Sequence, residues 1–78
     1  MSVARFPAHE RRIVRIISTA REKRGLSARA LSTQLGEVPS YIGRIERLER
    51  KLSVSEFTRI AEMLKRDPRE LFAETLLR

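Results

Sequence analysis

Apolar residues recur at helical spacing along most of the chain. The first stripe has members three or four positions apart, namely Ile13, Ile16, Ile17 and Ala20, which is the pattern of a helix that buries one face. Pro7 suits the start of this helix, and Gly25 suits its end. The pattern therefore predicts a helix over 8–24, and no segment alternates apolar and polar residues for long, as a strand would.

A short helix, a turn and a third helix are predicted next. Ser27 is a candidate N-cap of the short helix and Gly36 its end. The third helix begins near Pro39, because proline fits a first helical turn and not a helix interior. The spacing turns four apolar residues inward, namely Leu31, Leu35, Ile42 and Ile45. It leaves three residues of the third helix outside that stripe, namely Tyr41, Arg44 and Arg47.

Two further helices have clear start signals. Ser53 and Glu56 have the spacing of a capping box, and Asp67, Pro68 and Glu70 combine an N-cap, a first-turn proline and an acidic third residue. The expected buried stripe of the fourth helix is Val54, Phe57, Ile60, Ala61 and Leu64. The less polar face of the fifth is Leu71, Phe72, Thr75 and Leu76. Five helices joined by short turns predict a compact all-α globule.

The stretch 28–45 has the pattern of a helix-turn-helix. Its two helices are joined at Gly36, where the chain needs a positive φ, and Ser32 is small where the helices approach each other. In such a motif the second helix enters the DNA major groove. A plain helical hairpin is the alternative interpretation of the same pattern.

Positive charge is confined to one part of the chain. The 78 residues carry 17 Lys and Arg against 10 Asp and Glu, a net charge of +7. Residues 1–51 hold 12 basic and 5 acidic residues, and residues 52–78 hold 5 of each. A one-sided basic field indicates a polyanionic partner, nucleic acid first and an acidic membrane second. A solvated surface with a chance bias is the alternative.

Composition excludes several classes of protein. The chain has no cysteine and a single histidine, His9, which we expect on the surface, so disulfides, thiolate zinc sites and histidine metal clusters are ruled out. No apolar run reaches the ~18–20 residues of a membrane span, and the N-terminus lacks the apolar core of a signal peptide. No nucleophile, phosphate loop or convergent acid pair is found, so we expect neither an enzyme nor a bound cofactor or metal. The expected location is cytoplasmic.

An ordered set of residues runs through these helices. Its members are AREKRGLS at 20–27, Leu31, LG at 35–36, SYI at 40–42, RIER at 44–47, ERKL at 49–52, EF at 56–57, IAE at 60–62 and Leu64. In these residues the chain resembles the lambda-repressor-like helix-turn-helix family, also called Cro/cI-type or XRE. The resemblance covers about residues 13–72 and implies a five-helix DNA-binding domain. Residues 1–12 would then form a basic arm and the start of the first helix, and residues 73–78 the end of the last helix.

The resemblance implies an ion pair and a set of base-reading residues. In the family, an Arg late in the first helix pairs with a Glu late in the recognition helix, here Arg21 and Glu46, although both could be solvated surface charges. Base reading would fall to Ser40, Tyr41 and Arg44. Arg44 would grip a guanine edge, with a phosphate contact or simple solvation as the alternative. Tyr41 would contact phosphate or a thymine methyl, or else cover the outer core.

The resemblance also implies phosphate contacts on both sides of the recognition helix. The residues before it are Ser27, Ala28 and Arg29, at a helix N-terminus with free N–H groups, together with Pro39. The residues after it are Arg47, Arg50 and Lys51. Solubilising surface charge is the alternative role for each cation.

Three positions depart from the family pattern. Ala28 stands where Gln is frequent, and Glu37 places a negative charge in the turn. Leu48 stands where Gly usually follows the recognition helix, so this helix either continues through Arg50 or ends with another cap. These departures bear on how the domain docks more than on its fold.

The two ends of the chain have expected roles as well. Arg5, Arg11 and Arg12 would form an arm over the DNA, although a frayed terminus without function is the favoured interpretation. A two-fold dimer is expected through apolar residues of the fifth helix, namely Leu71, Phe72, Thr75 and Leu76, with Leu77 adding to the surface. Packing within one chain is the alternative. A symmetric dimer would require a palindromic DNA site.

The sequence therefore predicts a sequence-specific DNA-binding transcriptional regulator, a repressor acting as a homodimer on a palindromic operator. Its expected partner is double-stranded DNA, with no membrane and no small-molecule ligand. The short chain leaves no room for a sensor domain, so control would come from its own level, proteolysis or a partner. The rival interpretation is an antitoxin-like or adaptor module, which Glu37 and the missing Gln favour and the localised charge opposes.

Overall fold

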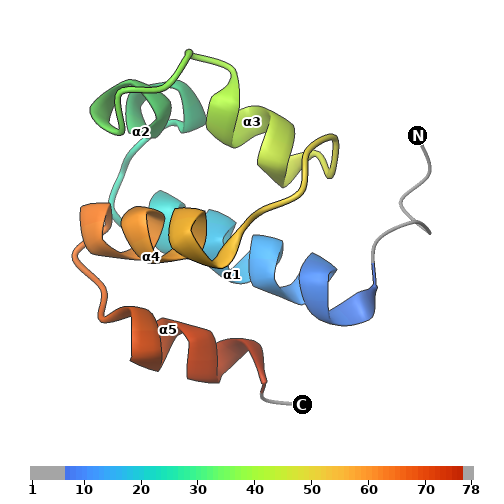
Figure 1. Ribbon diagram of the computed structural model, residues 1–78. Helices are drawn as coiled ribbons and strands as arrows, with labels where there is room; N and C mark the ends of the chain where they lie inside the picture. Colours follow the sequence, from blue (N-terminus) through green and yellow to red (C-terminus); the bar gives the residue numbers. More distant parts are fainter. Residues whose placement is uncertain (1–6, 77–78) are drawn as a thin grey trace.

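Five α-helices joined by short turns make up the described part of the chain (Figure 1). The structure is a computed structural model in which residues 7–76 are described. The helices are α1 (Ala8–Lys23), α2 (Ala28–Gln34), α3 (Tyr41–Glu46), α4 (Val54–Met63) and α5 (Pro68–Thr75). Residues 7–76 contain no strand, and the predicted all-α, five-helix fold is confirmed.

The helices enclose one core. Helices α2 and α3 lie on one side, α5 lies on the opposite side, and α1 and α4 lie between them (Figure 1). Helix α1 packs against both α3 and α5, and α4 packs against α5. Every helix contributes to the largest fully buried apolar side chains, which are Ile17, Leu31, Ile42, Ile45, Ile60, Leu64 and Leu71. Burying these side chains together is the main force that holds such short helices in place.

Two expectations about the core need correction. In α1, Val14 is buried beside Ile17, whereas Ile13 and Ile16 are only partly buried against the core. Val54 was expected in the buried stripe of α4, but it is 84% exposed. Because Val54 is the first helical residue, it lies beyond the edge of the core, and Leu52 from the preceding loop packs against the core instead.

The helix ends follow the local sequence closely. Ser53 and Glu56 form the predicted capping box of α4, and the Asp67 side chain accepts a hydrogen bond from the Arg69 amide at the start of α5. Gly36 has a φ of 76° in the turn between α2 and α3, as the motif requires. These caps satisfy backbone groups that the first and last helical turns leave without partners.

Helix α3 ends without the usual glycine. Leu48 adopts the left-handed conformation, with a φ of 61°. The Leu48 amide donates to the Ile45 carbonyl at 3.0 Å and the Glu49 amide to the Arg44 carbonyl at 2.9 Å, which is a Schellman cap. Of the two alternatives for this helix, the structure shows the second: α3 stops at Glu46 and does not continue through Arg50.

Candidate nucleic-acid interface

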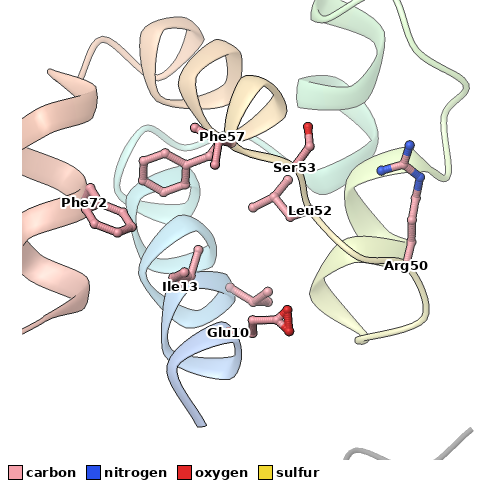
Figure 2. A pocket seen from close by; sticks show the side chains of 9 residues that line it. Glu10, Ile13, Arg50, Leu52, Ser53, Phe57 and Phe72 are labelled. Atoms are coloured by element: carbon pink, nitrogen blue, oxygen red, sulfur yellow. The ribbon is translucent and has the colours of Figure 1, made fainter. Parts of the chain in front are cut away.

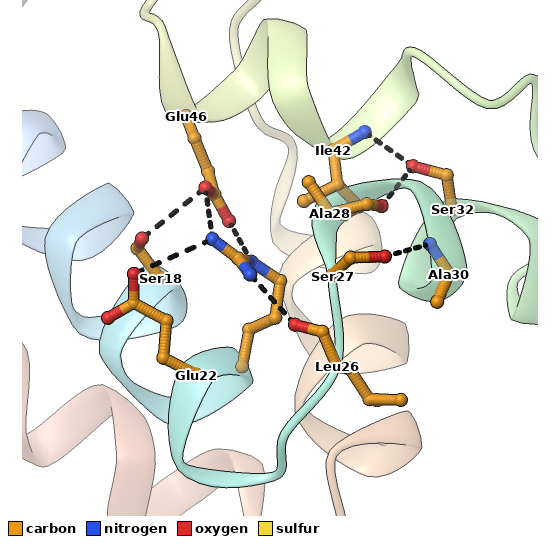
Figure 3. Close-up of polar contacts among 10 residues, drawn as sticks. Ser18, Glu22, Leu26, Ser27, Ala28, Ala30, Ser32, Ile42 and Glu46 are labelled. Carbon is orange, nitrogen blue, oxygen red and sulfur yellow. Dashed lines mark hydrogen bonds and ion pairs between the residues drawn. The ribbon is translucent and has the colours of Figure 1, made fainter.

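A buried serine joins the two helices of the helix-turn-helix. The Ser32 hydroxyl donates to the Ala28 carbonyl at 2.8 Å and accepts from the Ile42 amide at 2.9 Å (Figure 3). Ser32 is fully buried, so this hydroxyl satisfies a backbone amide in the first turn of α3 that has no partner within the helix. The sequence identified Ser32 only as a small residue. The feature of the sequence that could have predicted the hydrogen bond to α3 is a hydroxyl residue on the buried face of a short helix.

An ion pair ties the recognition helix to α1. Arg21 makes two hydrogen bonds to the Glu46 carboxylate: Nε donates to Oε2 at 2.7 Å, and Nη2 donates to Oε1 at 2.9 Å (Figure 3). The two side chains are only 12% and 15% exposed. Arg21 also donates to the Leu26 carbonyl at 2.8 Å, and the Ser18 hydroxyl donates to Glu46. The hydrogen bond to Glu46 raises the pKa of Arg21 against the opposing effect of burial. The structure thus joins the two residues that the family resemblance pairs.

The outer face of α3 is polar and basic. Ser40 and Arg44 are exposed, and they share this face with Gly43 and Arg47 at helical spacing. No described carboxylate forms an ion pair with Arg44. A Cβ at Gly43 would lie 3.0 Å from Arg47 Nη1, so the absence of a side chain there lets the Arg47 guanidinium lie along the helix. This face therefore presents donors with little bulk between them.

Tyr41 does not lie on that outer face, and the expectation that it falls outside the apolar stripe is wrong. Its side chain is 5% exposed, and its hydroxyl donates to Glu56 Oε2 at 2.9 Å. Arg50 covers the ring, with the guanidinium carbon 5.0 Å from the ring centroid. Burial and the hydrogen bond to Glu56 raise the pKa of Tyr41 to about 12. Tyr41 takes the second of its two suggested roles, in the outer core, and its hydroxyl is already engaged.

The residues before α3 that were expected to contact phosphate lie mostly at the surface. Ser27 caps α2, because its side chain accepts from the Ala30 amide at 3.0 Å. Arg29 and Pro39 are exposed, and Ala28 is partly buried against the core. The Ser27 oxygen accepts the capping bond and keeps its hydroxyl hydrogen, so the groups at this end that can donate to a phosphate are the Ser27 hydroxyl, the Arg29 side chain and the first amides of α2.

The basic residues after α3 are each paired with a carboxylate, which the sequence did not reveal. Arg47 Nε lies 3.0 Å from Glu49, and Lys51 Nζ lies 3.2 Å from Glu10 on α1. Both pairs are exposed, so they contribute little to stability. Arg50 Nη1 lies 2.8 Å from Glu56, and this carboxylate is largely covered. The three cations are thus oriented by acidic neighbours from the loop itself, from α1 and from α4.

The expected dimer residues divide into two groups. Leu71 and Thr75 are fully buried within the chain, so they do not form an intermolecular surface and the expectation for these two is wrong. The reason is that α5 packs one face onto α1 and α4. Phe72 on α5 and Leu76, the C-cap of α5, are 41% and 56% exposed and lie about one turn apart. Leu77 lies outside the described residues.

His9 connects the start of α1 to α5 and is partly buried rather than on the open surface. Its Nε2 lies 3.0 Å from the Thr75 hydroxyl oxygen, and its ring meets Phe72 edge-on at 5.8 Å. Thr75 donates its hydroxyl hydrogen to the Phe72 carbonyl at 2.7 Å, so it accepts from His9. Arg11 and Arg12, two of the expected arm residues, are part of α1, and Arg5 lies outside the described residues.

An apolar pocket lies between α1, the start of α4 and α5 (Figure 2). It has a volume of about 90 Å³ and is lined mainly by Ile13, Val14, Leu52, Val54, Phe57 and Phe72. Phe57 and Phe72 meet edge-on there, with ring centroids 5.9 Å apart. The loop before α4 lies between the pocket and α3 (Figure 2), and Glu10 and Arg50 are the charged residues of the lining.

Comparison with known proteins agrees with this geometry. Residues 17–71, more than half of the chain, match the family model described as Helix-turn-helix (HTH_3). Searches of curated proteins and of solved structures returned no match. Each helix of residues 7–76 is too short or too polar to serve as a transmembrane segment. The chain belongs to the Cro/cI-type, XRE-like helix-turn-helix family of DNA-binding transcription regulators.

Proposed function

We propose that the protein is a sequence-specific repressor whose helix α3 reads the DNA major groove. The observation that carries this proposal is the outer face of α3, where Ser40 and Arg44 are exposed while Ser32 and the Arg21–Glu46 pair hold the helix in place. A recognition helix has to be rigid, because its contacts with bases require hydrogen-bond donors to be placed within a fraction of an ångström.

Base reading falls to Arg44 and Ser40 in this proposal. Arg44 has a planar guanidinium that forms no ion pair with a described carboxylate, which suits two parallel hydrogen bonds to guanine O6 and N7. Ser40 makes no capping hydrogen bond with α3 through its side chain, so its hydroxyl remains available to a base edge or a phosphate. Tyr41 is left out of the base-reading set because its ring is buried.

Phosphate contacts flank the reading helix. Before α3, the exposed Arg29 side chain and the first amides of α2, at Ser27 and Ala28, would meet one phosphate, with Pro39 packing beside the backbone. After α3, Arg47, Arg50 and Lys51 would meet the next. The pairs formed by Arg47 and Lys51 are exposed, so a phosphate can replace their carboxylates at low cost.

The repressor would act as a two-fold dimer. Phe72 and Leu76 give α5 an exposed apolar strip, and a symmetric pair of such strips would set two α3 helices about 34 Å apart, matching successive major grooves of a palindrome. A bound dimer covers the DNA it occupies, and this is sufficient to block transcription. Activation would require an additional contact with the transcription machinery.

Selection of bound sequences from a random duplex library tests the proposal. We expect an enriched palindrome, and we expect Arg44→Ala to lose preference at one position in each half-site, worth roughly 1–3 kcal/mol. Arg69→Ala is the matched control, because Arg69 is an exposed arginine on α5 whose ion pair is with neighbouring Asp67. Absence of any enriched sequence would reject the proposal and favour the protein-interaction alternative.

The dimer has a separate test in sedimentation velocity. Wild-type protein should sediment as a dimer at micromolar concentration, and Leu76→Glu should shift it to monomer by placing charge in the apolar strip. Glu70→Gln, an exposed α5 residue outside that strip, should leave the dimer intact. A wild-type monomer at these concentrations would exclude the dimer while leaving half-site reading open to the selection experiment.

A further inference from the structure

We propose that Glu56, an acidic residue, promotes DNA binding by positioning Arg50 for a backbone phosphate. The inference rests on the proposed function, since it assumes that Arg50 meets phosphate after α3. It means that the negatively charged Glu56 side chain, close to the DNA-binding surface, raises the affinity of the protein for negatively charged DNA. Simple charge repulsion predicts the opposite sign.

The Glu56 carboxylate is fixed from two directions. Its Oε1 accepts from the Ser53 amide at 2.9 Å, as part of the capping box that begins α4. Its Oε2 accepts from the Tyr41 hydroxyl at 2.9 Å, which brings in the first residue of α3. The carboxylate therefore bridges the recognition helix and α4, and neither oxygen is free to swing away.

Arg50 rests on this fixed group. Its Nη1 lies 2.8 Å from Glu56 Oε2 and also donates to the Lys51 carbonyl at 3.2 Å. The guanidinium carbon lies 5.0 Å from the Tyr41 ring centroid, a distance at which the cation is attracted to the ring. One charged contact, one backbone contact and one aromatic face together hold the guanidinium in a single orientation.

The remaining edge of the guanidinium is the one that suits phosphate. Nη1 makes both of the polar contacts, with Glu56 Oε2 and with the Lys51 carbonyl, whereas Nε and Nη2 donate to no residue in the described part of the chain. These two nitrogens form the edge that binds an oxyanion with two parallel hydrogen bonds. Figure 2 shows the Arg50 side chain beside α3, and Arg50 is also one of the residues that line the apolar pocket. Arg50 is thus prepared for phosphate without first breaking its pair with Glu56.

The other two cations of the loop differ in this respect. Arg47 uses its Nε and Nη2 to reach Glu49, at 3.0 and 3.5 Å, so its phosphate-binding edge is already occupied. Lys51 presents its single ammonium to Glu10. In these pairs the carboxylate competes with phosphate. In the Arg50 pair the carboxylate holds the opposite side of the guanidinium, and the entropy cost of ordering the side chain is met on folding.

The test compares Glu56→Gln with Glu49→Gln, which remove the same charge from nearby positions. Binding to a fluorescent duplex selected from the random library is measured by anisotropy over a range of salt concentrations. We expect Glu56→Gln to lower the affinity for DNA about tenfold. We also expect the slope of log affinity against log salt concentration to become less steep, by the amount that corresponds to the loss of about one phosphate contact. Glu49→Gln should raise affinity, because it frees Arg47. Arg50→Ala should lose as much affinity for the duplex as Glu56→Gln does. The double variant should lose no more affinity than Arg50→Ala alone.

Two further measurements distinguish the positioning role of Glu56 from a role in folding alone. Thermal unfolding reports whether Glu56→Gln remains folded at the binding temperature; glutamine keeps an acceptor for the Ser53 amide, so we expect it to do so. Tyr41→Phe keeps the ring under Arg50 and removes only the hydroxyl that fixes Glu56. It should reduce affinity in the same direction, by less, and it carries the test if Glu56→Gln does not fold.

The inference is overturned if folded Glu56→Gln, or Tyr41→Phe in its place, binds at least as tightly as wild type with an unchanged salt slope. It is also overturned if Arg50→Ala has no effect while Arg44→Ala weakens binding. In both cases the proposed function stands. If the wild type itself shows no salt-dependent binding to any duplex, the proposed function fails, and this inference fails with it.

Discussion

Arg21 and Glu46 form a two-point contact, with Nε 2.7 Å from one carboxylate oxygen and Nη2 2.9 Å from the other. Glu46 is the last residue of α3, and Arg21 lies in the last turn of α1. The pair therefore fixes the end of the reading helix, while Ser32 fixes its beginning. Both contacts lie on the side of α3 away from the exposed Arg44, so they set the direction in which that residue is presented.

Arg21→Ala should weaken folding as well as DNA binding. It leaves the Glu46 carboxylate without its main partner in a largely covered position, and we expect a loss of about 2–4 kcal/mol in the free energy of unfolding. Urea unfolding followed by circular dichroism measures this. Arg47→Ala removes an exposed pair and should cost far less stability. An unchanged Arg21→Ala melting temperature would show that the pair does not hold α3.

Ser32→Ala should destabilise the helix-turn-helix at its junction. The substitution removes the acceptor of the buried Ile42 amide, which costs about 1–3 kcal/mol when no other group replaces it. Chemical denaturation gives the size of the loss. The neighbouring Thr33→Ala is the control, because the Thr33 hydroxyl bonds only to its own helix at an exposed position. Equal losses in the two variants would mean that water replaces the Ser32 hydroxyl.

Lys65→Gly should stabilise the protein. Lys65 follows α4 with a φ of 62° and is exposed, so it bears the cost of a left-handed conformation, about 1 kcal/mol. Glycine relieves this cost and should raise the melting temperature. Lys65→Ala removes the same charge but retains Cβ, so it should not give this gain. A matching rise in the alanine variant would trace the effect to charge instead of backbone conformation.

Acid should weaken the protein partly through Glu56. Burial raises the pKa of Glu56, but hydrogen bonds from the Ser53 amide, Tyr41 and Arg50 outweigh it, so the pKa lies below the ordinary value of 4.5. A carboxyl group whose pKa is lower when folded stabilises the protein above its unfolded pKa, and this stability is lost as pH falls through the folded value.

The measurement is the free energy of unfolding of wild type and Glu56→Gln from neutral pH to about pH 3. We expect the advantage of wild type to shrink across the acidic end of this range. Other carboxyl groups with lowered pKa values, such as Asp67 beside Arg69, are common to both proteins and drop out of the difference. A constant difference between wild type and Glu56→Gln at all pH values would exclude a contribution from this ionisation.

Local signals in the sequence predicted the helices and their ends. Ser27, Ser53 and Asp67 cap the helices that they were expected to cap, because an N-cap depends on only a few neighbouring residues. Helical spacing also identified the inward residues of α2 and α3, including Leu31 and Ile45. Spacing predicted burial less well at helix ends. Val54 falls at the helical spacing of the buried residues of α4, but it lies beyond the edge of the core and is exposed.

The amino-acid sequence by itself determined the five helices, the turn at Gly36 and the side of α3 that carries Arg44, because hydrophobic spacing and backbone preferences act over a few residues. Only the tertiary structure decided that Tyr41 and Thr75 are buried, and that Glu10, Glu49 and Glu56 orient the three basic residues after α3. Two of these pairings join residues from different helices or loops, and their geometry depends on how α1, α3 and α4 pack around the core. No local pattern records which carboxylate meets which cation, so spacing along the chain could locate the positive charge but not the direction in which each guanidinium points.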